Sequence, residues 1–153
     1  MEKLKVNKLQ KGDTIGFLIA SSANRSDKFQ KIEEELNKLG FKVKFGKTCY
    51  LKDGYLAGTD EERINDIHEM FSDPEIKAII CLKGGAGASR IIDKLDYELI
   101  NKNPKLFMGF SDVTVLLNNL YIPGEKPVWY TSVCIPVDLT RSVSSSPAGD
   151  SPW

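Results

Sequence analysis

The feature that most constrains the fold is a regular alternation of short apolar runs with amphipathic segments over residues 1–122. The runs at 14–20 and 76–82 have the length of strands and almost no charge, as expected of strands buried on both faces of a sheet. The segments between the runs place apolar residues three and four positions apart, which is the spacing of one helix face. Strands that alternate with helices of this length form parallel βαβ units. The sequence therefore predicts an α/β fold with an open, mostly parallel sheet of about five strands flanked by helices.

Local signals mark where these helices begin and end. Thr59 and Glu62 have the spacing of a capping box, in which the side chain of each residue accepts a hydrogen bond from the backbone amide of the other. Gly40 follows the first helical segment and has the freedom to end a helix in a left-handed conformation. The expected strands are 14–20, 41–45, 76–82 and 106–109, and the expected helices are 26–39, a segment that opens at 59, 86–95 and 112–121.

The chain changes character near residue 122. Residues 123–153 hold five of the seven prolines and both tryptophans, and 142–149 has the composition of a flexible linker. A strand within 128–137 is at best an edge strand, because prolines bracket it. We therefore expect one domain over residues 1–122 and a divergent Pro/Ser-rich tail over 123–153, which is disordered over its last ~15 residues.

The composition restricts partners and chemistry. The 21 basic and 21 acidic side chains give a net charge of zero, which argues against nucleic acid or an anionic membrane as the main partner. No apolar stretch approaches the length of a membrane span and no secretory signal is visible, so we expect a cytoplasmic protein. The cysteines form no close pair, and His68 is the single histidine. We therefore expect no disulfide framework, no metal site and no cofactor.

Three loops at the carboxyl ends of expected strands could form a ligand site: 21–23, 84–87 and 110–112. The glycines of 84–87 allow positive φ and close backbone approach, so their amides could bind an anion such as phosphate. The alternative is a tight turn between a strand and a helix. The spacing is neither that of a P-loop nor that of a dinucleotide-binding fingerprint.

Ser111 lies in the segment Gly109-Phe110-Ser111-Asp112, between an expected strand and an expected helix. A sharp turn at this point would lift the serine hydroxyl above the sheet and leave the next amide free to stabilise an oxyanion. Only the first glycine of the G-x-S-x-G elbow is present, since Val113 occupies the position of the second. The alternative is that Ser111 caps the helix that follows.

Two other groups of polar residues have structural explanations. His68 lies on an apolar helix face, where a packed, hydrogen-bonded histidine is commoner than a catalytic one. The carboxylates of Asp60, Glu61 and Glu62 lie in the first turn of a helix, where the helix dipole favours negative charge.

Taken together, these segments resemble the LD-carboxypeptidases, a family of serine peptidases that includes the microcin-immunity peptidases. The resemblance covers about residues 5–121 and corresponds to the amino-terminal domain of the family, with a flavodoxin-like or class I glutamine-amidotransferase-like arrangement of layers. The matching segments are 9–16, 20–22, 55–63, 73–81, 84–87, 95–97, 103–105 and 109–114, in that order.

The resemblance implies an activity and a set of site residues. Members of the family hydrolyse the L–D peptide bond of murein tetrapeptides in the cytoplasm and release D-alanine. Ser111 occupies the position of the nucleophile, and the amides of Asp112 and of the Gly84-Gly85 turn, with Gly85 foremost, correspond to the oxyanion hole and to substrate contacts. The expected partner is a murein peptide or a related small peptide, and the choice between murein peptides and peptide antibiotics stays open.

The chain departs from the family pattern in two ways. Lys83 and Ala86 stand where the family usually has arginine and tyrosine, which alters contacts that could hold substrate. The family also has a carboxy-terminal domain, with a glutamate and a histidine that complete a Ser-Glu-His triad, whereas no histidine follows Ser111 here. We therefore expect a truncated or frame-shifted reading that is inactive alone.

Three further expectations follow from this departure. A face left uncovered near Ser111 and after Tyr121 would be apolar and would favour self-association, for instance as a homodimer. A second hypothesis for the function is a non-catalytic module that binds a small molecule or peptide through the same loops. A third possibility is that a separate chain supplies the missing groups.

Overall fold

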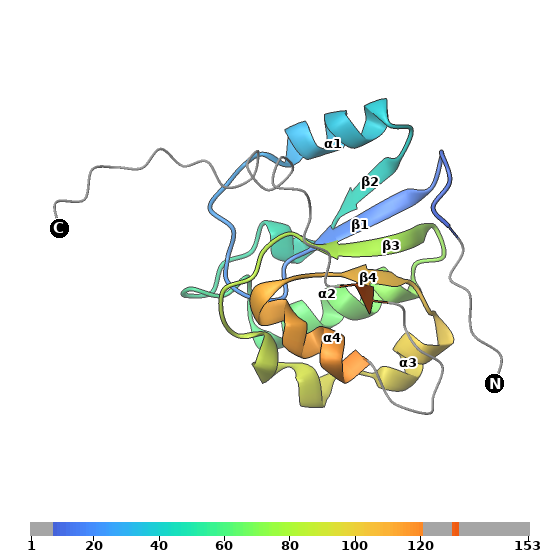
Figure 1. Cartoon of the computed structure of the whole chain (residues 1–153). Coiled ribbons are helices and arrows are strands. Elements are labelled where there is room, and N and C mark those ends of the chain that lie inside the picture. The colour runs from blue at the N-terminus through green and yellow to red at the C-terminus, as the bar shows by residue number, and fades with distance from the viewer. Residues whose placement is uncertain (1–7, 121–129, 132–153) are drawn as a thin grey trace, which may run out of the picture.

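A parallel sheet of five strands forms the centre of the protein (Figure 1). The computed structural model describes residues 8–120 and 130–131. The strands are β1 (Thr14–Leu18), β2 (Lys42–Phe45), β3 (Ile76–Cys81), β4 (Leu106–Met108) and β5 (Tyr130–Thr131). They pair in the order β2-β1-β3-β4-β5, and every pair is parallel. The predicted α/β fold is therefore confirmed.

Helices cover both faces of this sheet (Figure 1). The helices are α1 (Phe29–Lys38), α2 (Asp60–Ser72), α3 (Tyr97–Lys102) and α4 (Thr114–Leu120). On one face, Ile32 and Leu36 of α1 pack in a cluster with Phe17 of β1. On the other face, α2, α3 and α4 pack in a larger cluster around Leu18 and Ile79, both fully buried. Successive side chains of each strand point to opposite faces of the sheet, so the strands contribute to two separate apolar layers.

The predicted signals are found at the start of α2 and at the end of α1. Thr59 Oγ1 accepts a hydrogen bond from the amide of Glu62 at 3.2 Å, and Glu62 Oε2 accepts one from the amide of Thr59 at 2.8 Å. Gly40, which follows α1, has φ +91°. Both observations confirm the local chemistry that the sequence predicts.

The expectation of a single helix over 86–95 is wrong. This segment forms two short 3₁₀ turns, η2 (Ala88–Arg90) and η3 (Ile92–Lys94), although its apolar face is buried as predicted. The reason lies at Gly87, which has φ +109° and whose carbonyl oxygen accepts a hydrogen bond from the side chain of Arg63. The amide of Ile91 bonds instead to Ala88, three residues back, which gives the tighter turn.

Helix α3 was not anticipated, and only part of the carboxy-terminal prediction can be compared. Six residues are too few to show a helical period, and the sign of α3 in the sequence is Asp96, whose side chain caps the amide of Leu99. Strand β5 lies at the edge of the sheet beside β4, inside the range predicted for an edge strand. The rest of the predicted tail, 123–153, lies outside the described residues. Of the apolar patch expected near Ser111, Phe110 is partly exposed.

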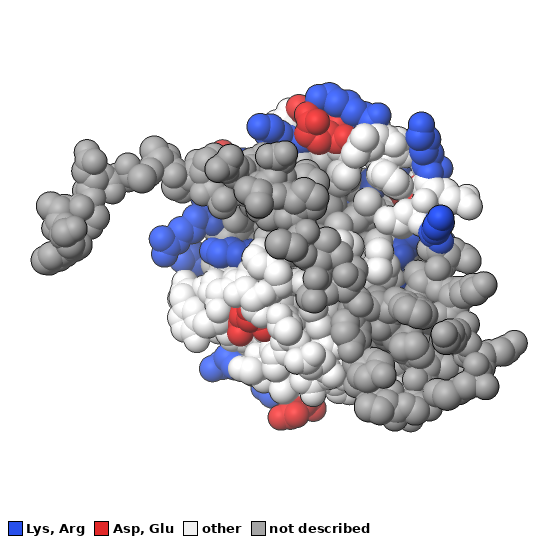
Figure 2. Space-filling model, viewed as in Figure 1, with Lys and Arg blue, Asp and Glu red and all other residues white. Residues whose placement is uncertain are grey.

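Side chains of both signs share the surface. Figure 2 shows basic and acidic residues side by side over α1, where Lys38 pairs with Glu35 at 2.7 Å. None of the helices among the described residues combines the length and apolar character needed to cross a bilayer.

A buried lysine from another part of the chain binds the carboxyl end of helix α2. Lys105 is 7% exposed, and its Nζ donates hydrogen bonds to the carbonyl oxygens of Met70, at 2.8 Å, and of Asp73. It thereby satisfies carbonyl groups that have no partner within the helix. Burial lowers the pKa of Lys105 to about 8.

Raising the pH is expected to stabilise the native chain relative to Lys105→Met between about pH 8 and 10.5. The folded-state pKa lies below the unfolded value, so the unfolded state binds more protons in this window and stability rises with pH. The gain is up to about 3 kcal/mol at 1.36 kcal/mol per pKa unit. Denaturant unfolding at several pH values measures it, with Lys31→Met as an exposed control. Parallel curves for the native chain and Lys105→Met would show that Lys105 is not linked to folding.

Candidate active site

The three loops singled out in the sequence lie together at the carboxyl ends of β1, β3 and β4. These strands are neighbours in the sheet, so the loops after them converge. A Cβ atom added to Gly84 would lie 2.8 Å from Ser111 Cβ, and one added to Gly85 would lie 2.2 Å from Ser22 Oγ. The predicted clustering of 21–23, 84–87 and 110–112 is therefore confirmed.

Ser111 has an unusual backbone conformation. Its φ is +57°, and it is the one residue other than glycine with a positive φ in the described part of the chain. Phe110 before it is extended, and a 3₁₀ turn, η4 (Ser111–Val113), begins at Ser111 and leads into α4. A left-handed L-residue costs roughly 1–2 kcal/mol. The chain therefore makes a sharp, strained turn from strand to helix at this serine.

The interpretation of Ser111 as the cap of the helix is wrong. The residue in the cap position is Phe110, and no side chain caps the turn. The connection between β4 and α4 is so short that Ser111 is already the first residue of η4. The amide of Val113 donates the hydrogen bond of this turn to the carbonyl oxygen of Phe110, at 3.2 Å. The hydroxyl of Ser111 is thus not used to start the helix.

Two glycines make room for this turn. A Cβ at Gly109 would come within 2.4 Å of Val113 Cγ1, and a Cβ at Gly84 would come within 3.1 Å of Ser111 Oγ as well as near its Cβ. Val113, which replaces the second glycine of the elbow pattern, thus fills the space that Gly109 leaves. Gly84 lets the backbone of the β3 loop lie directly against the serine side chain.

The glycine loop after β3, residues 84–87, is a tight turn, and some of its backbone amides donate no hydrogen bond within the described residues. Gly85 and Gly87 have φ of +123° and +109°, and Ser22 Oγ accepts the amide of Ala86 at 3.1 Å. Within residues 8–120 and 130–131, the amides of Gly84, Gly85 and Asp112 donate no hydrogen bond. Lys83 Nζ donates a hydrogen bond to the carbonyl oxygen of Ala23 at 2.7 Å, so one of its three donors is already engaged within the protein.

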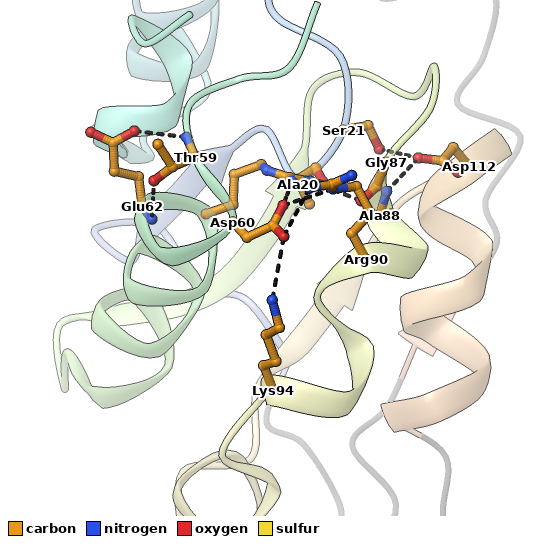
Figure 3. Close-up of polar contacts among 11 residues, drawn as sticks. Ala20, Ser21, Thr59, Asp60, Glu62, Gly87, Ala88, Arg90, Lys94 and Asp112 are labelled. Atoms are coloured by element: carbon orange, nitrogen blue, oxygen red, sulfur yellow. Dashed lines mark hydrogen bonds and ion pairs between the residues drawn. The ribbon is translucent and has the colours of Figure 1, made fainter. Parts of the chain in front are cut away.

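The side chain of Asp112 joins the start of this helix to the other two loops. Its Oδ2 accepts hydrogen bonds from Ser21 Oγ, at 2.7 Å, and from the amide of Ala88, at 2.9 Å (Figure 3). Sequence reasoning considered only the amide of Asp112. The signal that could have indicated more is an acidic residue directly after the candidate nucleophile.

Arg63 of α2 is the other polar link at this edge, and sequence reasoning missed it. Its side chain is fully buried, and its Nη1 donates to the carbonyl oxygens of Ala20 and Gly87, each at 2.9 Å. Its Nη2 pairs with Asp60, which also pairs with Arg90 and Lys94. Hydrogen bonding from Arg90 is the main cause that lowers the pKa of Asp60. Helix-start electrostatics therefore explain Asp60 only in part.

The other titratable candidates are structural. His68 Nε2 accepts the amide of Asp96 at 2.9 Å, as the structural interpretation predicts, and burial lowers its pKa. Burial raises the pKa of the Cys49 thiol to about 12 and raises that of Cys81 as well, which keeps both thiols protonated. No group of three or more potential metal ligands is found in the described part of the chain.

Comparison with known proteins assigns this arrangement to a family. The family described as the LD-carboxypeptidase N-terminal domain matches residues 15–129, which is most of the chain. The chain belongs to the LD-carboxypeptidase family. The family that the sequence resembles is therefore confirmed, and the match is to its amino-terminal domain.

Individual relatives are similar over the same region of this chain. A probable murein peptide carboxypeptidase of Bacillus subtilis is 46% identical over 108 residues, which are 71% of this chain and 34% of the relative. A murein tetrapeptide carboxypeptidase of Pseudomonas aeruginosa is 32% identical over 111 residues, 72% of this chain and 36% of the relative. The crystal structure of an MccF-like protein from Bacillus anthracis superposes with a TM-score of 0.68 at 37% identity, over 72% of this chain and 35% of that one. The chain thus spans about a third of the length of these relatives.

Proposed function

We propose that Ser111 is the nucleophile of a serine-type LD-carboxypeptidase. The observation that carries the proposal is the positive φ of Ser111 at a turn from strand to helix, with Gly84 packed against its side chain. A strained turn of this kind costs stability, and such strain is concentrated at functional sites. The membership of the family and the names of the relatives support the same activity.

The proposed reaction is hydrolysis of the L–D peptide bond of a murein tetrapeptide, in the cytoplasm, with release of D-alanine. Ser111 Oγ attacks the carbonyl carbon, and the negative charge on the carbonyl oxygen is stabilised by the amides of Asp112 and Gly85, which are unpaired within the described residues. The C–N bond then breaks, D-alanine leaves as the amine, and water hydrolyses the ester on Ser111. The backbone of Gly84 and Gly85 contacts the bound substrate. The free thiols of Cys49 and Cys81 are compatible with a reducing compartment.

The 153-residue chain by itself is proposed to be inactive. A serine hydroxyl needs a general base to take its proton and to return it to the leaving amine. His68, the single histidine, is bonded to the amide of Asp96, and the carboxylate of Asp112 is bonded to Ser21 and Ala88. We propose that the general base comes from groups beyond those that the structure describes.

Transfer of the domain into a relative tests the proposal. Residues 1–120 would be joined to the remaining part of the Bacillus subtilis relative, and D-alanine release from a murein tetrapeptide would be compared between the chimera and the 153-residue chain. We expect turnover by the chimera and none above background by the chain alone. A folded chimera that binds the peptide without cleaving it would favour the non-catalytic binding module. Turnover by the chain alone would require another general base.

A further inference from the structure

Two polar side chains join the loop after β1 to the loop after β3 at consecutive residue pairs. Arg63 bridges the carbonyl oxygens of Ala20 and Gly87. Asp112 bridges the hydroxyl of Ser21 and the amide of Ala88 (Figure 3). The guanidinium, which also pairs with Asp60, donates both of these bonds to the loops, and the carboxylate accepts both of its bonds. The two loops are thus held by partners of opposite charge, one on α2 and one at the start of η4.

We propose that the carboxylate of Asp112 is a positioning residue, which fixes the glycine loop 84–88 relative to Ser111. The inference rests on the proposed function, in which Ser111 is the nucleophile and the amide of Gly85 holds the oxyanion. Asp112 is the chain neighbour of Ser111, so its side-chain bonds attach the strained serine directly to the two loops beside it.

The bonds of Asp112 are not those of a residue that serves its own helix. An acidic side chain in a first turn commonly accepts amides of that turn. Here Oδ2 instead accepts from Ser21 and Ala88, which are 91 and 24 residues away in the chain. The side chain therefore acts between loops, and its loss should be felt in the glycine loop before it is felt in α4.

The neighbouring contacts leave Gly85 in a defined place. Ser22, the residue after Ser21, accepts the amide of Ala86, and its side chain packs where a Cβ of Gly85 would lie. The glycine loop is thus held on the carboxyl side of Gly85 by Ser22 and further along by Asp112 at Ala88. A shift of Ser21 and Ala88 would move both contacts, and with them the unpaired amide of Gly85.

Amide hydrogen exchange of the 153-residue chain and covalent labelling of the active chimera test this role. The variants are Asp112→Ala, which removes both bonds, Asp112→Asn, whose amide oxygen can still accept both, and Ser21→Ala, which removes one. We expect exchange at Ala88 to be at least about tenfold faster in Asp112→Ala, with amides of β1 and β3 unchanged, and to be close to native in Asp112→Asn. Labelling of Ser111 by a fluorophosphonate, measured in the active chimera and located by mass spectrometry, should slow by a similar factor in Asp112→Ala and recover in Asp112→Asn.

The outcomes separate this inference from the proposed function. Unchanged exchange at Ala88 in Asp112→Ala, or faster exchange throughout the sheet, would overturn the positioning role. If Asp112→Ala fails to fold, Ser21→Ala decides by the same local readout. Absence of Ser111 labelling in the active chimera would count against the nucleophile, whereas the exchange result at Ala88 would still decide the role of Asp112.

Discussion

Replacement of Ser111 by alanine is expected to lower kcat for D-alanine release by the active chimera about 10⁴- to 10⁶-fold. Without the hydroxyl no ester can form, and only the stabilisation supplied by the unpaired amides and by binding remains. KM should change little, because the backbone of the glycine loop stays in place. The measurement is steady-state release of D-alanine, with Ser72→Ala at an exposed position as a matched control. Retention of more than about a tenth of the native kcat would exclude Ser111 as the nucleophile.

Glycine at the same position separates catalysis from folding. Ser111→Gly removes the hydroxyl and also the steric cost of φ +57°, so activity should be lost while the unfolding free energy rises by about 1 kcal/mol. Ser111→Ala keeps the strain and should not show this gain. Thermal or denaturant unfolding of the three chains makes the comparison. Equal stability of the alanine and glycine variants would mean that the turn is not strained.

The sequence was sufficient for the architecture because strand burial and helix periodicity are local signals. The runs that became β1 and β3 carry almost no charge, and Thr59 with Glu62 forms the capping box that its spacing predicts. The α/β fold and the meeting of three loops follow from strands that are parallel neighbours.

The details of the site depend on contacts that local patterns do not contain. A serine between a strand and a helix has the same sequence whether it caps the helix or occupies a left-handed elbow, and its φ distinguishes the two. The 86–95 segment has a helical apolar face, yet the carbonyl oxygen of Gly87 accepts from the amide of Arg90 and from Arg63, 24 residues earlier in the chain, and not from the amide of Ile91 as in an α-helix. Asp60 had a complete local explanation at its helix start, which concealed its pairing with Arg63 and Arg90.

Replacement of Arg63 by methionine is expected to lower the unfolding free energy by about 2–5 kcal/mol. The guanidinium is fully buried, and its removal takes away the bond to the carbonyl oxygen of Ala20 and leaves that of Gly87 with the amide of Arg90 alone. Methionine fills much of the volume, so the loss reports mainly on the polar contacts. Denaturant unfolding measures it, and Arg90→Met is the matched control: Arg90 pairs with the same Asp60 but is 54% exposed, so its loss should cost less than about 1 kcal/mol.

A lysine at 63 should restore only a minor part of this stability, because one ammonium group cannot reproduce a fork that reaches two carbonyl oxygens and a carboxylate. The double variant Arg63→Met with Asp112→Ala gives the sharper test. Both side chains join the same two loops, so once one link is lost the loops can part, and removing the second should cost less than it does in the native chain. Strictly additive losses would mean that the two links act independently. A loss below about 1 kcal/mol in Arg63→Met would mean that water replaces the guanidinium at both carbonyl groups, and that the glycine loop does not need Arg63 to stay beside Ser111.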